Sequence, residues 1–324
     1  MNADQPAVLT RAVVTGAAGF IGSHLVRHLR NHGADVWGID RSRRSGTEDV
    51  VDEVADVSFE GVIDAHLDER TVLFHMAGSA DVRGSVEEPA HDFTHNVVPT
   101  LRALEAVRRC GASMIFPSSG SVYDPAGALP FREDSPVRPS SPYGAGKVSA
   151  EAYCAAYHRT FEVDLRVARI FSVFGPGMRR FAIYDFCERL QAEPDRLVIF
   201  GDGRQTRHFI YVEDVARALA AIAERGSPGE TYNVAAGQPM RMLDVAREVA
   251  RAMGLKDSDV VPDSAEYAAE LDRMEADLSR MSRLDLESET PFREGLQATV
   301  RFLTSPDSPC GSPESVTADP GSGF

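Results

Sequence analysis

The stretch RAVVTGAAGFIGSHL, residues 11–25, decides the fold. A short apolar run ends in a glycine-rich turn, and a helical pattern begins directly after it. Gly16, Gly19 and Gly22 follow one another at three-residue spacing. Gly16 suits a tight turn, Gly19 lets a pyrophosphate approach the backbone, and Gly22 lets the helix lie close to the strand. Because the helix N-terminus then faces the negative charge, the stretch predicts a phosphate-binding loop.

Further along the chain, short apolar runs alternate with longer amphipathic stretches. The runs are DVWGI, TVLFHM, SMIF and LRVARIF, and a helix is expected from about residue 97, where Val97, Leu101, Leu104 and Val107 share one face. This alternation is typical of an α/β protein with a Rossmann-type, doubly wound parallel sheet. After residue 172 the chain becomes rich in Gly-Pro turns and helical patterns, which predicts a smaller C-terminal lobe.

An acidic residue ends the second apolar run. Asp40 closes DVWGID, where a carboxylate accepts both ribose hydroxyls and repels a 2′-phosphate. Arg41 favours NADP instead, because a guanidinium can bind the 2′-phosphate. We therefore expect NAD as the cofactor in preference to NADP.

The expected domain boundaries follow from these patterns. Residues 8–171 are expected to form the NAD-binding Rossmann domain, with residues 209–235 returning to it. Residues 172–208 and 236–303 are expected to form the substrate-binding lobe. Residues 304–324 are nearly all Ser, Pro, Gly and Asp, a composition that predicts a disordered tail.

Charge and cysteine content exclude several classes of protein. The formal net charge of −15 argues against broad nucleic-acid binding, which needs clustered Lys and Arg. The apolar runs are too short to span a membrane, and the N-terminus lacks the pattern of a secretory signal, so we expect a cytoplasmic protein with no membrane partner. The four cysteines are scattered without a C-x-x-C pair, which fits packing residues in a reducing compartment.

Two groups of histidines raise the question of a metal site. His24, His28 and His32 share a helical face, and His91 and His95 lie four residues apart. Neither group contains the glutamate of an H-E-x-x-H pattern or a clear third ligand, so solvated or capping histidines are the expectation and no metal site is predicted.

The stretch SSPYGAGK, residues 140–147, places a phenol and an amine one helical turn apart. Ser141 is a candidate N-cap and Pro142 suits the first turn, so Tyr143 and Lys147 are expected to project from the same helix face. A neighbouring ammonium and a cationic nicotinamide both favour the phenolate, and lowering the phenol pKa by about three units takes roughly 4 kcal/mol. Such a phenolate can exchange a proton with a sugar hydroxyl.

Four motifs carry a resemblance to a known family. TGAAGFIG, PSSGSVY, SPYGAGK and GDGRQTRHFIYVEDVARA occur in the order found in extended short-chain dehydrogenases/reductases. More narrowly, the chain resembles the NAD-dependent nucleotide-sugar epimerase/dehydratase group over roughly residues 10–303. The resemblance implies a nucleotide-sugar substrate and a homodimer built from the helices after residues 85 and 142.

The resemblance also implies roles for individual residues. Ser119 is expected to hydrogen bond the reacting sugar oxygen, Tyr143 to act as acid and base, and Lys147 to bind the nicotinamide ribose and hold the phenolate. Residues expected at the cofactor, besides Tyr143 and Lys147, are Gly16, Gly19, Phe20, Ile21, Gly22, Asp40, Arg41, Asp56, Val57, Ala77, Gly78, Asn96 and Phe171. Residues expected at the substrate are Ser119, Gly120, Ser121, Tyr143, Ser172, Arg179 and Arg207.

The implied reaction is oxidation of the sugar C4 hydroxyl to a transient ketone, followed by return of the hydride to the opposite face, which is an epimerisation. A 4,6-dehydratase uses Asp and Glu directly after the Ser or Thr, and here Gly120 and Ser121 stand there. A dehydratase or a 4-keto-sugar reductase remains the alternative, and a non-catalytic NAD-binding sensor or scaffold is the alternative of another class. Ser172 replaces a commoner Asn, and YAAE at 267–270 replaces an expected diphosphate contact.

Overall fold

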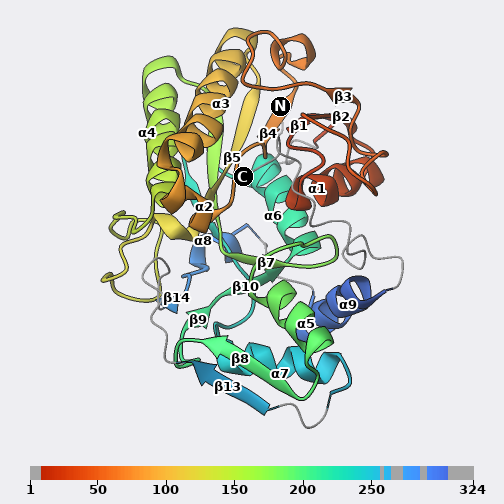
Figure 1. The fold of residues 1–324 in the computed structure, drawn as a ribbon. Helices are drawn as coiled ribbons and strands as arrows, with labels where there is room; N and C mark the ends of the chain where they lie inside the picture. Colours follow the sequence, from red (N-terminus) through yellow and green to blue (C-terminus); the bar gives the residue numbers. More distant parts are fainter. Residues whose placement is uncertain (1–8, 256–258, 264–272, 285–289, 306–324) are drawn as a thin grey trace.

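A parallel sheet of seven strands forms the centre of the upper lobe in the computed structural model (Figure 1). The structure describes residues 9–255, 259–263, 273–284 and 290–305. The strand order is β11-β6-β5-β4-β1-β2-β3, and the five apolar runs of the sequence all lie in this sheet. Successive strands are added on one side of β1 as far as β3 and on its other side from β4 onward. Open α/β sheets bind ligands at such a change of strand order. The strands are β1 (Arg11–Thr15), β2 (Asp35–Asp40), β3 (Glu53–Val54), β4 (Val72–His75), β5 (Ser113–Ser119), β6 (Leu165–Ile170) and β11 (Thr231–Val234).

Helices cover both faces of the sheet, as expected for the doubly wound class. α1 (Phe20–Asn31) and α6 (Val212–Arg225) pack on one face, where Leu25 and Leu219 are fully buried. α3 (Pro89–Cys110) and α4 (Pro142–Phe161) pack on the other face, where Leu104 and Cys154 are fully buried. Each fully buried leucine contributes about 1.5–3 kcal/mol. The predicted α/β architecture is confirmed.

The helix expected from about residue 97 begins earlier, at Pro89. The face of its first three turns that points into the protein carries Asp92, Asn96 and Thr100, which are buried polar residues. Apolar periodicity therefore starts only at Val97, and the sequence pattern placed the start of the helix too late. The helix ends at Gly111, whose φ of +70° is the left-handed C-cap conformation that glycine adopts without strain.

The lower lobe has its own core between helices and short strands (Figure 1). Phe186 and Leu190 of α5 pack with Leu197 and Ile199 of β8 and with Val245 of α7. β8 pairs with β13, β7 pairs with β10, and β12, β9 and β14 form a three-stranded sheet. The elements are β7 (Ser172–Phe174), α5 (Ala182–Ala192), β8 (Arg196–Phe200), β9 (Thr206–Arg207), β10 (Phe209–Tyr211), β12 (Met240–Arg241), α7 (Met242–Ala252), β13 (Asp259–Asp263), β14 (Arg273–Met274) and α9 (Phe292–Thr304).

Short elements complete the described chain. They are the 3-10 helices η1 (Asp64–His66) and η2 (Gly120–Val122), α2 (Val82–Glu87) and α8 (Ser279–Ser282). No helix in the described ranges has the length and apolar character needed to cross a membrane. The expected tail lies outside the described residues from position 306 onward, and so does the YAAE segment at 267–270.

The two lobes are joined by backbone hydrogen bonds between neighbouring crossings of the chain. Phe171 alone links β6 to β7, and its N–H donates to the carbonyl of Val234 at 3.0 Å. The N–H of Ala236 donates to the carbonyl of Phe209 at 3.1 Å. Nearby, the fully buried Asn233 accepts from the hydroxyl of Tyr123 at 2.6 Å. Of these hydrogen bonds, the one between Ala236 and Phe209 crosses the expected boundary between the lobes.

Candidate active site

The glycine loop connects β1 to α1 with two close approaches. Gly16 has a φ of +70°, and a Cβ atom there would lie 2.7 Å from the backbone nitrogen of Ala77. A Cβ atom on Gly22 would lie 2.1 Å from the carbonyl oxygen of Gly16. Both separations are shorter than any stable carbon contact, so the loop needs glycine at these positions. The tight turn expected at Gly16 and the close packing expected at Gly22 are both present.

The N-terminus of α1 opens beside this loop. α1 begins at Phe20 with Gly19 as its N-cap, and no side chain caps its first turn. The N–H of Ala18 donates to the Asp40 carboxylate at 2.9 Å, which fixes the loop against the end of β2. The uncapped N–H groups and the helix dipole together favour an anion such as a pyrophosphate.

The residues expected at the adenosine lie at the edge formed by β2 and β3. The N–H of Ala55 donates to the carbonyl of Asp40 at 2.9 Å, so Asp56 follows directly beyond the end of that strand pair. Arg41 is exposed and its charge acts on Asp56. Val57 is buried and packs with Ile63 in the core under α3.

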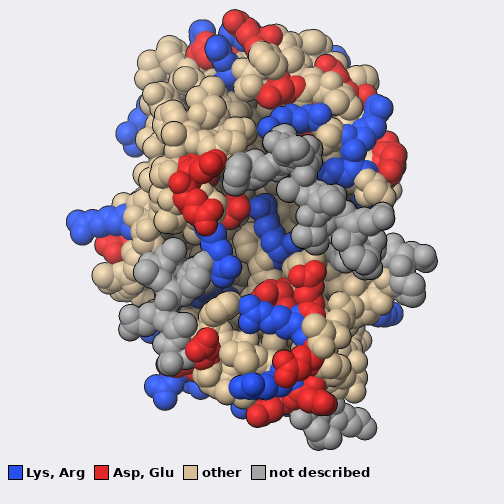
Figure 2. All heavy atoms as spheres, viewed as in Figure 1, with Lys and Arg blue, Asp and Glu red and all other residues tan. Residues whose placement is uncertain are grey.

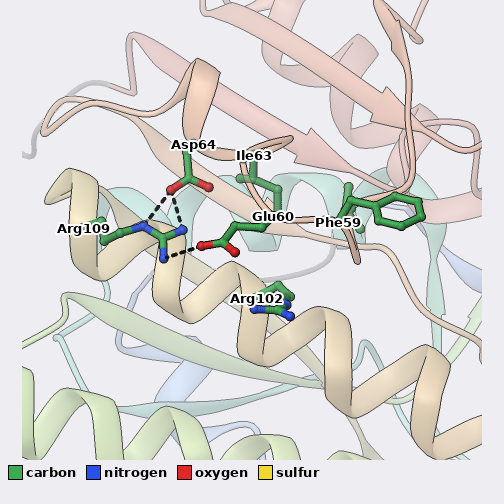
Figure 3. A pocket seen from close by; sticks show the side chains of 8 residues that line it. Phe59, Glu60, Ile63, Asp64, Arg102 and Arg109 are labelled. Carbon is green, nitrogen blue, oxygen red and sulfur yellow. Dashed lines mark hydrogen bonds and ion pairs between the residues drawn. The ribbon is translucent and has the colours of Figure 1, made fainter.

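A small hollow lies on the far side of Val57, next to α3 (Figure 3). It has a volume of about 10 Å³. The guanidinium of Arg109 lies across it, bound to Asp64 at 2.6 Å and within 3.8 Å of Glu60. These charges are already paired with one another. The ion pairs connect the segment after β3 to α3 and leave little for an adenine to bind.

On the α3 side of the glycine loop, the buried side-chain amide of Asn96 lies against the backbone that follows β4. The backbone after β4 carries Ala77 and Gly78, and a Cβ atom on Gly78 would lie 2.6 Å from Oδ1 of Asn96. This oxygen is buried and accepts no hydrogen bond from the described residues, while the amide nitrogen donates to Asp92 at 2.9 Å. An orphaned buried acceptor costs about 1–3 kcal/mol unless a ligand satisfies it.

These features fit a dinucleotide. The loop has glycine where a Cβ would collide, the uncapped helix end suits the pyrophosphate, the Asp40 carboxylate suits the ribose, and the Asn96 oxygen awaits a donor. Ala77, Gly78 and Asn96 come together around the loop as the sequence predicted, while Phe20 and Ile21 form the first turn of α1.

Tyr143 and Lys147 lie in the first two turns of α4, on one buried face. Ser141 is the N-cap and accepts from the N–H of Gly144, and Pro142 is the first helical residue, as predicted. Ser85 of α2 accepts from the N–H of Tyr143 at 3.1 Å and fixes the start of the helix. Lys147 Nζ donates to the carbonyl of Pro117 at 3.0 Å and lies 5.9 Å from the centre of the Tyr143 ring.

Ser119 completes the group from the end of β5. Its hydroxyl hydrogen bonds the Tyr143 side chain and also accepts from the N–H of Ser121 at 3.1 Å. A Cβ atom on Gly120 would lie 2.7 Å from Met274 and 3.1 Å from Phe171, so these residues pack tightly where the two lobes meet. Ser119, Tyr143 and Lys147 therefore stand together, as the sequence predicted.

Burial dominates the electrostatics of this group. Burial raises the pKa of Tyr143 above its ordinary value, although the hydrogen bond with Ser119 and the charge of Arg180 act to lower it. Burial lowers the pKa of Lys147 to about 8, against the opposing negative charge of Asp92 and Glu151. The charges of this chain alone therefore leave the phenol protonated, and a further positive charge at the site is needed to form the phenolate.

The residues expected at the substrate line the lower side of this group. Ser172 starts β7, and its N–H donates to the carbonyl of His208 at 3.1 Å. Arg207 lies in β9 and is largely buried. Both ring nitrogens of His208 are used within the lobe, one by the N–H of Ala276 and one at the carbonyl of Gly237.

Arg179 and Arg180 are both exposed, and the charge of Arg180 acts on Tyr143. Desolvation lowers the pKa of Arg180, while the charges of Asp81 and Tyr143 act to raise it. The sequence assigned only Arg179 to the site. Figure 2 shows Lys and Arg side chains gathered in the middle of this face, where the lobes meet, with acidic groups beside them.

Comparison with known proteins shows which family this chain resembles. The model of the "NAD dependent epimerase/dehydratase family" matches residues 12–235. A UDP-glucose 4-epimerase from Mycolicibacterium smegmatis is 33% identical over 314 residues, which cover 90% of this chain and 98% of that protein.

Solved structures agree with this match. The Thermotoga maritima UDP-glucose 4-epimerase with UDP-glucose is similar with a TM-score of 0.82 and 28% identity, over 90% of this chain and 98% of that one. A dTDP-glucose 4,6-dehydratase from Streptomyces venezuelae with NAD bound has a TM-score of 0.81 and 26% identity, over 90% of this chain and 96% of that one. The fold is thus shared by proteins whose names give different reactions, an epimerisation and a dehydration.

Proposed function

The chain belongs to the NAD dependent epimerase/dehydratase family, and from this premise we propose that it is an NAD-dependent nucleotide-sugar 4-epimerase acting on UDP-hexoses. One observation carries the choice of reaction. Ser119, Tyr143 and Lys147 stand together, whereas the two positions after Ser119 hold Gly120 and Ser121. Elimination of water needs an additional acid and base, and neither residue is one.

Each residue of the group has a task in this reaction. Tyr143 removes the proton of the sugar C4 hydroxyl and later returns it to the same oxygen. Ser119 donates a hydrogen bond to that oxygen, and the Lys147 ammonium stabilises the phenolate between the two transfers. NAD, when bound, accepts hydride from the sugar carbon and gives it back. The new configuration arises because the transient ketone presents its other face before the hydride returns.

The proposed binding residues divide between the lobes. Residues 8–171 and 209–235 are proposed to hold NAD, and residues 172–208 and 236–303 to hold the sugar nucleotide. The uncapped N-terminus of α1 and the orphaned Asn96 oxygen support the first part. The charge of Arg180, which acts on Tyr143, supports the second, and Arg179 remains a proposed substrate residue next to it.

We further propose a homodimer built from α3 and α4. These helices pack side by side at the edge of the upper lobe (Figure 1). Their outer surface exposes large aromatic side chains, with Phe93 51%, Tyr153 45% and Phe161 50% accessible. Exposed apolar groups clustered on one face favour association. A cytoplasmic location is also proposed, supported by the free thiols of Cys110, Cys154 and Cys187.

The deciding experiment uses the purified protein and UDP-glucose without added cofactor. We expect a mixture of UDP-glucose and UDP-galactose at equilibrium, and we expect Tyr143→Phe to lower kcat by about 10³-fold or more with an unchanged melting temperature. Stoichiometric consumption of added NADH or NADPH would identify a keto-sugar reductase, and a 4-keto-6-deoxy product would identify a dehydratase. A functional Tyr143→Phe variant would identify a non-catalytic NAD-binding protein.

A further inference from the structure

A buried carboxylate lies behind the Tyr143 and Lys147 pair, and the reaction described above does not use it. Asp92 of α3 is 3% exposed. Its Oδ1 accepts from the Asn96 amide at 2.9 Å, and its Oδ2 is buried with no hydrogen-bond partner among the described residues. Burying an ionised carboxylate in this way is costly unless a positive charge compensates it.

A positive charge that acts on Asp92 without a direct ion pair stands on the neighbouring helix, at Lys147. A Cβ atom on Gly146 would lie 3.2 Å from Asp92 Oδ2, so the carboxylate lies directly against the α4 backbone where Lys147 begins. The absence of a side chain at Gly146 allows this approach. Lys147 is itself 8% exposed, and its ammonium donates to the Pro117 carbonyl and lies over the rings of Phe116 at 5.1 Å and Tyr143 at 5.9 Å.

The other charges near Lys147 are already engaged. Glu151 binds Arg169 at 2.7 Å and accepts from the Ser118 hydroxyl at 2.5 Å, so its negative charge is largely compensated. The thiol of Cys154 is protonated because burial raises its pKa above the neutral range. On the other side, His75 of β4 is neutral because burial lowers its pKa to about 3.

Asp92 in turn is faced by a small set of groups. Burial raises the pKa of its carboxyl above the ordinary value, and the Asn96 amide, Lys147, His91 and His95 act to lower it. His91 and His95 stack on each other with ring centres 3.9 Å apart along the same helix. Lys147 is thus the cation of the set that acts on Asp92 from another element.

We propose that Asp92 is a positioning residue that acts as the counter-charge of Lys147 and keeps its ammonium protonated during turnover, with Asn96 holding the carboxylate in place. The proposal rests on the proposed function, because it assigns the charge that this reaction needs. The negative charge of Asp92 also disfavours the Tyr143 phenolate. Removing this charge therefore lowers the pKa of both Lys147 and Tyr143.

The sequence provides a direct measurement, because Lys147 and Lys256 are the only lysines in the chain. Protein labelled with ¹³C at lysine Cε gives two signals in an NMR titration, and a Lys256→Arg variant assigns them. We expect the Lys147 pKa near 8 in the wild type and a value lower by about one pH unit or more in Asp92→Asn, with the Lys256 signal unmoved. Asp92→Glu, which keeps the charge, should restore most of the wild-type value.

A matched control separates charge from packing. Asp214 of α6 is also buried, at 4% exposure, and lies on the opposite face of the sheet. Asp214→Asn should lower stability and leave the Lys147 titration unchanged. If Asp92→Asn does not fold, Asp92→Ser removes the same charge from a smaller side chain. A Lys147 pKa that stays near 8 in the folded variant would overturn the proposal.

The pH profile of kcat gives the functional readout. Loss of Asp92 should move both limbs of the bell-shaped profile to lower pH, whereas a purely structural defect lowers the amplitude and leaves the limbs in place. If the lysine titration responds to Asp92→Asn as expected but the wild type epimerises no sugar nucleotide, the counter-charge stands and the proposed function fails. If both limbs stay in place in an active Asp92→Asn enzyme, the counter-charge role itself is wrong.

Discussion

Arg180 is followed by a residue with an unusual backbone conformation. Phe181 has φ +73° and ψ 172°, a conformation that is nearly restricted to glycine and costs about 1–3 kcal/mol in other residues. Its half-exposed ring lies under the Arg180 guanidinium at 5.2 Å. Arg180 and Arg179 are both exposed beside this residue, and the charge of Arg180 acts on Tyr143.

Removing the Arg180 charge should make Tyr143 less acidic. Because Arg180 lowers the pKa of the phenol, Arg180→Gln should raise it and move the acidic limb of the kcat profile to higher pH. At a pH below that limb, activity should fall about tenfold for every pH unit by which the limb moves. The measurement is the epimerisation rate between pH 6 and about pH 9 at saturating substrate.

Arg179→Gln is the matched control, since it removes the same charge from the adjacent arginine, which is exposed like Arg180. We expect its profile to overlay that of the wild type. Equal displacement of the limb in the two variants would mean that the charge of the turn as a whole acts on Tyr143, and not that of Arg180 in particular.

At the scale of residues, sequence patterns were sufficient where chemistry follows from spacing. Tyr143 and Lys147 share a face because they are one turn apart, and Ser141 and Pro142 fix where that turn starts. The choice between Arg179 and Arg180 could not be made in this way. Both are exposed, and only the structure shows that the charge of Arg180 acts on Tyr143.

Among the elements, β11 carries a side chain that holds the two lobes together. Asn233 is fully buried, accepts from the Tyr123 hydroxyl, and donates to the carbonyls of Phe131 and Asp277 at 2.9 and 3.2 Å. Asn233→Ala leaves these groups unpaired, and we expect the free energy of unfolding to fall by about 3 kcal/mol. Chemical denaturation measures the loss.

Asn31, the exposed last residue of α1, supplies the comparison. Asn31→Ala should change the free energy of unfolding by less than about 0.5 kcal/mol. A similar small effect from Asn233→Ala would show that water replaces the lost partners and that the joint does not depend on this side chain.

The exposed aromatic surface of α3 and α4 tests the proposed dimer. Phe93→Glu places a charge on this surface, and we expect the variant to elute as a monomer in size-exclusion chromatography with light scattering, where the wild type is dimeric. Val54→Glu, on the edge strand β3, changes an equally exposed apolar residue elsewhere and should remain dimeric. A monomeric wild type would contradict the proposal.

Helix α3 also shows where periodicity fails as a guide to an element. Its second half follows an apolar pattern and was predicted, whereas its first half buries Asp92, Asn96 and Thr100. These buried polar residues bond within the helix, from Asn96 to Asp92 and from Thr100 to the Asn96 carbonyl, so no apolar periodicity marks their buried face.

For the molecule as a whole, the parallel sheet and its two layers of helices followed from alternating apolar runs, because that alternation has few compact solutions. The lower lobe was predicted only as a lobe. Its strands β9, β12 and β14 are two residues long and pair across wide separations in sequence, so no local pattern marks them.

The hydrogen-bonded joint between the lobes predicts little motion on binding. The N–H of Ala236 donates to the Phe209 carbonyl and that of Phe171 to the Val234 carbonyl where the chain crosses, so we expect the lobes to keep their relative orientation when NAD and the sugar nucleotide bind. Small-angle X-ray scattering with and without both ligands should give the same radius of gyration. A clear decrease would indicate that the joint opens and closes.

A fixed orientation of the two lobes limits how the substrate range of the enzyme can be changed by design. If the lobes keep their relative orientation, a bulkier sugar is admitted by trimming individual exposed side chains such as Arg180. Lengthening the connections between the lobes would bring no gain in substrate range and would sacrifice the pairing at Phe171.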